Sequence, residues 1–177
     1  QEATEQRGLE NLRNTANALP VLRREDVKEL FQRQAVISPV ELESRYEVYS
    51  EQYTLAVEVE AKVALSIVRT QISPAVQKHL SSLARSITQQ QAVGLNPDQR
   101  TLQQTAELQQ RMQDQINALD DELHQLHQGD TTASMNHAAG VLLPRLLQLR
   151  EAVDGLEGLV DDDRWPLPSY REMLFVR

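Results

Sequence analysis

Two histidines near the middle of the chain have a spacing that could support metal chemistry. His124 and His127 stand one helical turn apart, and the acidic run Asp120–Glu122 comes just before them. Residues three or four positions apart share one face of a helix, so a weak transition-metal site is one interpretation. The pattern specifies no third ligand from another element. We therefore favour the second interpretation, a solvated helix end.

Carboxylates occur in two further patterns. Glu60 falls on the same helical stripe as Ala56 and Val63, in a strongly apolar stretch that also contains Glu58. A buried glutamate must be paired or neutral, so Glu60 could act as a general base, but we predict a hydrogen bond or salt bridge that fixes helix register. The run 161–163 is all aspartate, yet it lacks the alternating ligands of a calcium loop. We predict a solvated acidic turn there.

The remaining composition limits the possible functions. The chain has no cysteine, which excludes thiol catalysis, thiolate metal sites and disulfides, and is compatible with the cytoplasm. A net charge of −8 argues against nucleic acid and anionic membranes as partners. The sequence contains no glycine-rich phosphate loop and no supported Ser/His/Asp motif. We predict no catalytic, cofactor-binding or metal-binding residue in this chain.

The composition predicts a helical domain. Among 177 residues only 6 are glycine and 7 are proline, while leucine, alanine, glutamine and glutamate are abundant. Ser38, Pro39 and Glu41 form a capping-box pattern, which predicts a helix over about 39–93. This helix is apolar on two sides, and Pro74 predicts a kink within it.

Two more long helices follow. Gly94 suits the end of the first helix, and Asn96 with Pro97 suits the start of the second, over about 97–128. The second helix carries a heptad seam, which requires a partner helix. Asp130 or Thr131 caps a third helix over about 132–160, where Pro144 predicts another kink. Short connections predict an all-α, antiparallel up-and-down bundle over 38–160.

The segments that flank this bundle differ in character. Residues 1–37 are predicted as a connecting segment with short helices, over 1–13 and 24–34, and an irregular stretch between them. Residues 161–177 are predicted as the acidic turn followed by an extended strap, because Pro166 and Pro168 disfavour helix. This strap would lie either on the chain's own helices or on a partner subunit.

Aromatic residues are the strongest candidates for packing or interface contacts. Tyr46, Tyr49 and Tyr53 form a stripe on the first long helix, and three of the seven aromatics lie in the strap. Such a stripe is more typical of a core or an interface than of a cofactor site. The residues that we predict to make these contacts are Tyr46, Tyr49, Tyr53, Glu60, Trp165, Tyr170 and Phe175.

Several short segments resemble one enzyme family in order and spacing. They are Gly8-Leu9-Glu10-Asn11-Leu12, Asn17-Ala18-Leu19-Pro20, Glu43-Ser44-Arg45-Tyr46-Glu47, Val59-Glu60-Ala61, Pro74-Ala75-Val76 and the ending Trp165-Pro166-Leu167-Pro168-Ser169-Tyr170. Together they resemble type III glutamine synthetases, downstream of the catalytic core. The resemblance covers residues 5–80 and 150–177. The sequence departs from the family pattern at Lys62-Val63-Ala64 and at Arg171.

The resemblance implies a parent enzyme that joins ammonia to glutamate with ATP and a divalent metal such as Mg²⁺, in large ring assemblies. Its catalytic residues would lie upstream, so this chain by itself would be a non-catalytic structural, oligomerisation or regulatory domain. Its partners would be the catalytic domain and neighbouring subunits. Two alternatives remain open at this stage: a free-standing helical adaptor that binds a partner helix, and a carboxylate/histidine metal bundle with oxidase-like chemistry.

Overall fold

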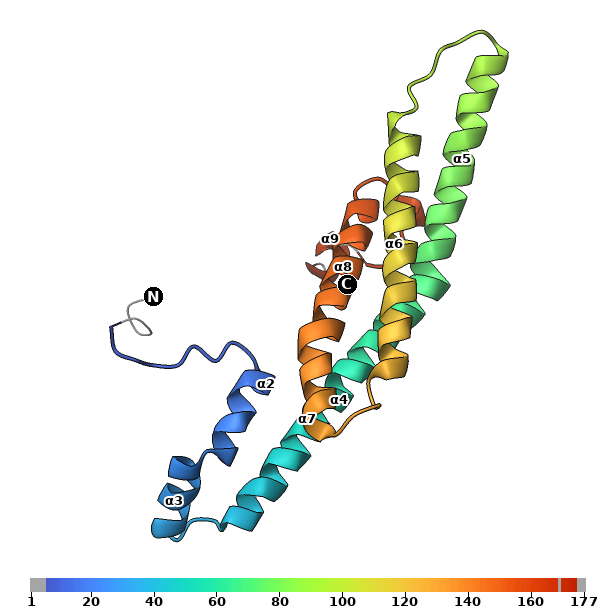
Figure 1. Ribbon diagram of the computed structural model, residues 1–177. Helices are drawn as coiled ribbons and strands as arrows, with labels where there is room; N and C mark the ends of the chain where they lie inside the picture. The colour runs from blue at the N-terminus through green and yellow to red at the C-terminus, as the bar shows by residue number, and fades with distance from the viewer. Residues whose placement is uncertain (1–5, 169, 175–177) are drawn as a thin grey trace. The chain divides into compact units, whose positions relative to one another are not determined.

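Every regular element of the described chain is helical. The computed structural model describes residues 6–168 and 170–174, and no strand occurs in these ranges (Figure 1). The α-helices are α2 Thr15–Ala18, α3 Glu25–Arg33, α4 Pro39–Ile67, α5 Ser73–Ala92, α6 Arg100–Gln125, α7 Thr131–His137, α8 Leu143–Glu157 and α9 Tyr170–Leu174. The predicted all-α fold is confirmed.

The chain forms two compact units. Unit 1 comprises Gln1–Glu60 and Leu123–Leu143, and unit 2 comprises Ala61–Glu122 and Pro144–Arg177. In unit 2, α6 lies beside α5 and runs in the opposite direction (Figure 1). Leu108 of α6 lies so close to α8 that a Cβ at Gly155 would stand 3.2 Å from its side chain. The predicted alternation of helix directions is therefore present among these helices.

The start of α4 is fixed by the predicted capping box. The backbone N–H of Ser38 donates to Glu41 Oε2 at 2.6 Å, and the N–H of Glu41 donates to Ser38 Oγ at 3.3 Å. These two bonds satisfy donors that have no partner in the first turn of a helix. From Pro39 the chain stays helical to Ala92, in agreement with the predicted helix over 39–93.

Each predicted proline interruption takes the form of a π-helical turn. Val68–Ile72 (η2) precedes Pro74, and Ala138–Leu142 (η3) precedes Pro144. The N–H of Ser73 donates to the carbonyl of Val68, and the N–H of Leu143 donates to that of Ala138. Because proline has no N–H and crowds the carbonyl four residues back, widening the preceding turn allows the helix to continue.

The predicted helix starts and connections need three corrections. Gly94 ends α5 with φ of +80°, as predicted, but α6 begins at Arg100, where Asp98 Oδ1 accepts the Arg100 N–H at 2.9 Å. Residues 6–13 contain no helix, so the predicted helix over 1–13 is wrong there. The stretch predicted to be irregular instead forms α2 and a 3-10 turn, η1 Leu19–Arg23. The predicted cap at Asp130 is confirmed, since Asp130 Oδ1 accepts the Ala133 N–H at 2.7 Å.

Buried side chains follow the predicted seams. In unit 1, Tyr46, Ala16 and Met135 form a cluster, with partly buried side chains against it: Leu19, Leu22, Tyr53 and Ala139. In unit 2 the apolar half of the α6 seam is inaccessible to solvent, at Met112, Ile116 and Leu119. The short N-terminal helices therefore contribute to the core of unit 1.

The C-terminal segment is extended only in part. A 3-10 turn, η4 Asp162–Arg164, leads into Trp165, whose backbone is extended with φ of −71° and ψ of 123°. After Pro168 the chain turns helical again in α9. The two prolines restrict only the residues around them, which explains why the extended strap does not continue. Phe175 and the side chain of Tyr170 lie outside what the structure describes.

Candidate functional site

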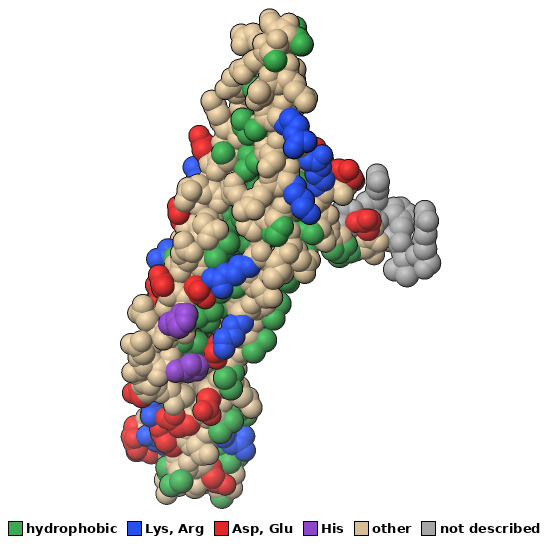
Figure 2. Space-filling model, turned by 90° about the vertical axis from the view of Figure 1, so that its right-hand side faces the viewer, with side chains coloured by type: hydrophobic (Ala, Val, Ile, Leu, Met, Phe, Trp, Pro, Cys, Tyr) green, Lys and Arg blue, Asp and Glu red, His purple; other side chains and the backbone are tan. Residues whose placement is uncertain are grey.

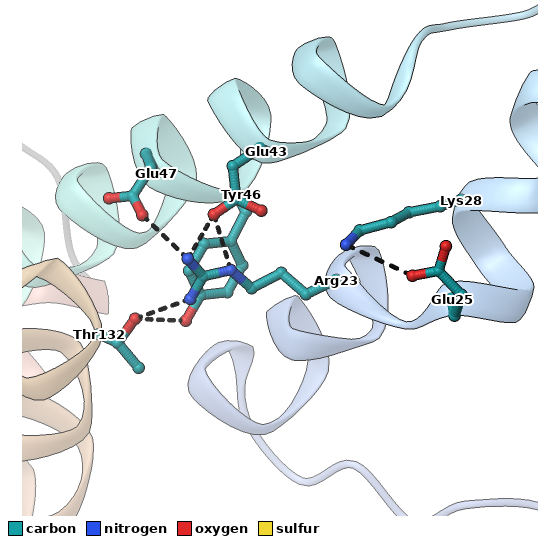
Figure 3. Close-up of polar contacts among 7 residues, drawn as sticks. All are labelled: Arg23, Glu25, Lys28, Glu43, Tyr46, Glu47 and Thr132. Atoms are coloured by element: carbon teal, nitrogen blue, oxygen red, sulfur yellow. Dashed lines mark hydrogen bonds and ion pairs between the residues drawn. The ribbon is translucent and has the colours of Figure 1, made fainter.

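The most connected polar cluster of unit 1 centres on Arg23, at the end of η1 (Figure 3). Its guanidinium lies over the ring of Tyr46, 4.1 Å from the centroid, and donates through Nη1 to Thr132 Oγ1 at 3.2 Å. Its Nε donates to Glu43 Oε1 at 2.8 Å, and Nη2 donates to both Glu43 and Glu47. Tyr46 Oη is also 3.0 Å from Thr132 Oγ1. The cluster joins η1, α4 and α7.

The electrostatics of this cluster favour its charged state. Hydrogen bonds donated by the Arg23 guanidinium hold the pKa of the Glu43 carboxyl below its ordinary value, and the positive charge of Arg23 lowers it further. The side chains of Arg23 and Glu43 are 40% and 41% exposed. An exposed ion pair contributes little to stability because solvent screens it, so the cluster fixes geometry more than it adds energy.

The predicted tyrosine stripe divides into two environments. Tyr46 is 1% exposed, whereas Tyr49 is 43% exposed. Tyr53 is partly buried, and its hydroxyl is buried without a hydrogen-bond partner in the described chain. Burial raises the pKa of the Tyr53 hydroxyl, and the negative charge of Glu60 raises it further. Tyr46 and Tyr53 therefore face inward, and Tyr49 is available to a partner.

Glu60 is exposed, so the premise that it is buried is wrong. Glu58, two residues earlier on the same helix, is partly buried and paired, which is close to the environment that we expected for Glu60. Glu58 is 13% exposed in its side chain, and its Oε2 lies 3.0 Å from His127 Nε2. The two stripes differ by two residues, about 200° around a helix, and both carry apolar neighbours, which is why the sequence pattern selected the wrong glutamate. A register role for Glu60 stays a prediction.

The histidine pattern gives a pairing rather than a ligand set. His127 contacts Glu58, on α4. Within residues 6–168 and 170–174, no group of three or more His, Cys, Asp or Glu side chains is arranged to hold a metal ion. The arrangement can act as a pairwise contact between α4 and the loop after α6. Glu58 and His127 are 69 positions apart, so the sequence pattern did not indicate that they pair.

The outer side of α4 in unit 1 is apolar. Val48, Leu55 and Val59 are 45%, 49% and 58% exposed, and Tyr49 is 43% exposed. Val48, Leu55 and Val59 recur at steps of seven and four, so they share one side of the helix, opposite the buried Tyr46. Tyr49 lies at the edge of this side, about 100° around the helix from Val48. We call Val48, Tyr49, Leu55 and Val59 the outer α4 face. Neither apolar side that the sequence predicts for this helix contains Val48, Leu55 or Val59.

Trp165 is held near α5 by its neighbour Asp161. The Trp165 N–H donates to the Asp161 carbonyl at 3.1 Å, and Asp161 Oδ2 lies 3.5 Å from Nδ1 of the buried His79. The indole Nε1 of Trp165 is buried without a hydrogen-bond partner in the described chain.

Among the described helices, none is long and apolar enough to cross a membrane.

Comparisons with known proteins agree with the resemblance seen in the sequence. A family model described as "Glutamine synthetase C-terminal domain" matches residues 1–91. A type-3 glutamine synthetase from Dictyostelium discoideum is 31% identical over 99% of this chain and 25% of its own length. A glutamine synthetase from Bacteroides fragilis (strain YCH46) is 24% identical over 100% of this chain and 25% of its own length. The chain thus spans about a quarter of the length of these relatives.

Proposed function

The chain belongs to the glutamine synthetase C-terminal domain family, and we propose that it is the non-catalytic C-terminal domain of a type-3 glutamine synthetase. The observation that carries this proposal is the match of 99% of the chain to one quarter of the Dictyostelium discoideum enzyme. An end-to-end match to a small part of a long enzyme is what a domain of that enzyme would give. The proposed role is structural.

The proposal assigns the chemistry to other parts of the parent enzyme. That enzyme would join ammonia to glutamate at the expense of ATP, with Mg²⁺, at residues outside this chain. No residue of this chain is proposed to bind ATP, Mg²⁺ or glutamate. A cytoplasmic location and assembly into a homo-oligomer are part of the same proposal.

The outer α4 face is our proposed contact with the catalytic domain of the same chain. Its aliphatic side chains and Tyr49 are 43–58% exposed. Contiguous exposed apolar side chains mark interaction surfaces in soluble proteins. An exposed tyrosine supports this assignment, since aromatic residues are enriched in interfaces. The segment that contains Trp165, Tyr170 and Phe175 is proposed as a second contact, with a neighbouring subunit.

The adaptor alternative receives less support. It requires the seam of α6 to be free for a partner helix. Met112, Ile116 and Leu119 on this seam are at most 2% exposed. A helix whose apolar seam is already covered has little apolar area to offer a partner.

Substitution of Val59 in the complete parent enzyme tests the proposal. Val59→Asp places a charge on the outer α4 face, so we expect this domain to lose its position on the catalytic domain, and with it the second contact, to the neighbouring subunit. We therefore expect loss of assembly, measured by light scattering, and loss of glutamine synthesis. Val93→Ser, at a valine that is 75% exposed at the end of α5, is the control and should change neither. Full assembly and activity of the Val59→Asp enzyme would refute the docking role of this face.

The isolated chain gives a separate test of the non-catalytic assignment. We expect no γ-glutamyl transfer from the purified chain in the presence of ATP, Mg²⁺, glutamate and ammonia. Turnover that co-purifies with the chain through successive columns would overturn it. A parent coding region without a catalytic domain upstream of Gln1 would overturn the family role itself.

A further inference from the structure

Unit 2 carries an open groove along α5 that is lined by cations. Its volume is about 630 Å³, and α5 supplies most of its wall. The lining residues are Pro74, Gln77, Lys78, Ser81, Ser82, Arg85 and, from η4, Arg164. Among the described residues, no aspartate or glutamate lines it. We call it the α5 groove.

Two of these cations have no carboxylate partner. The side chains of Lys78 and Arg85 make no ion pair or hydrogen bond within the described chain, whereas those of Arg23, Arg69 and Arg100 are paired with carboxylates. In Figure 2 the side of the molecule on which α5 lies in Figure 1 faces the viewer, and several Lys and Arg side chains gather there. A local excess of positive charge on an acidic chain is a candidate anion site.

Arg164 is held at the groove by the turn that contains it. Asp161 Oδ2 lies 3.2 Å from Arg164 Nε and 3.5 Å from Nδ1 of His79, a buried residue of α5. The Arg164 N–H also donates to the Asp161 carbonyl at 2.9 Å. Only Nε of the guanidinium is used in these contacts, so the two terminal nitrogens can still donate to a ligand.

Size and spacing restrict the ligand. Lys78 and Arg85 are seven residues apart, about 10 Å along a helix, which is too far for one phosphate to bridge. A volume of about 630 Å³ lies within the range of small-molecule sites. Arginine binds phosphate through two parallel hydrogen bonds, and the Ser82 hydroxyl and Gln77 amide add neutral donors.

We propose that the α5 groove binds a small molecule that carries a linear chain of phosphates. Lys78 and Arg85 contact the two ends of the phosphate chain, and Arg164 contacts it from the opposite wall. This site is separate from the outer α4 face and from the catalytic function of the parent enzyme.

Calorimetric titration of the 177-residue chain with inorganic tripolyphosphate tests the site. We expect binding to one site per chain, weaker at higher salt because charges at the surface are screened. The double variant Lys78→Gln/Arg85→Gln should bind at least about tenfold more weakly, since two charged hydrogen bonds to the phosphates are lost. Both side chains are exposed, so the variant should retain its circular dichroism spectrum.

Arg111→Gln is the control, because Arg111 is exposed on α6 and does not line the groove. It removes one positive charge and should bind tripolyphosphate as the unsubstituted chain does. Three outcomes would overturn the proposal: no binding at low salt, equal weakening by the control, or tighter binding of an oligoglutamate peptide of the same charge. The last outcome would identify the groove as an acidic-peptide site.

Discussion

Tyr46 and Tyr53 lie two turns apart on the inner side of α4, but only the hydroxyl of Tyr46 has a hydrogen-bond partner. Tyr46 Oη is 3.0 Å from Thr132 Oγ1. The Tyr53 hydroxyl is buried and has no partner in the described chain. A buried polar group without a partner costs stability, whereas a satisfied one contributes to it. The same residue type therefore has opposite effects at these two positions.

Removal of each hydroxyl should change stability in opposite directions. Tyr46→Phe should lower the free energy of unfolding by about 1 kcal/mol, because the bond to Thr132 is lost. Tyr53→Phe should leave this free energy unchanged or raise it by about 1 kcal/mol, because an unsatisfied group is removed. Urea unfolding followed by circular dichroism measures both. Destabilisation by Tyr53→Phe as large as that by Tyr46→Phe would show that the Tyr53 hydroxyl has a partner in solution.

Ala35 is a second position where a single group, here the Cβ methyl, should affect the free energy of unfolding. It follows α3 with φ of +52°, the left-handed conformation, and is exposed. In this conformation the Cβ of an L-residue destabilises the folded chain by about 1–2 kcal/mol. Glycine removes this strain, but its greater freedom in the unfolded chain offsets part of the gain. We expect Ala35→Gly to raise the free energy of unfolding by about 0.5–1 kcal/mol.

The matched control for Ala35→Gly is Ala106→Gly. Ala106 is exposed inside α6, where glycine should lower the free energy of unfolding by about 1 kcal/mol. Chemical unfolding of the two variants should therefore give shifts of opposite sign. A loss of stability in both would mean that the left-handed turn at Ala35 is absent in solution.

Local signals in the sequence were sufficient for the start of α4, the end of α5 and both proline interruptions. The Ser38–Glu41 capping box, the left-handed Gly94 and the breaks before Pro74 and Pro144 depend only on nearby backbone groups. Such groups satisfy or lose hydrogen bonds within one or two turns. These helix ends and interruptions can therefore be predicted without knowledge of the tertiary packing.

The partners of the site residues could not be predicted in this way. Arg23 meets Thr132 across 109 positions, and Glu58 meets His127 across 69. Which tyrosine of the stripe is buried depends on the segment that covers α4. That segment includes Leu19 and Leu22, in a stretch predicted to be irregular. Pairing between distant segments is decided by packing, for which a single sequence carries no pattern.

The ion pair between Arg23 and Glu43 should make stability depend on pH in the acidic range. The pKa of Glu43 is lower in the folded chain than its ordinary value of about 4.3 in the unfolded chain. The unfolded chain therefore binds the proton more readily, and stability rises with pH across this interval. The contribution of Glu43 is complete above its unfolded pKa and is lost as the pH falls through its folded pKa.

Urea unfolding at a series of pH values should show a shallower acid dependence for Glu43→Gln than for the unsubstituted chain. Glu51→Gln, an exposed change on the same helix, is the control and should keep the original slope. Parallel slopes for Glu43→Gln and the unsubstituted chain would mean that Arg23 does not hold Glu43 in solution, and the contact between η1 and α4 would then depend on the Arg23–Tyr46 stacking and on the packing of Leu19 and Leu22.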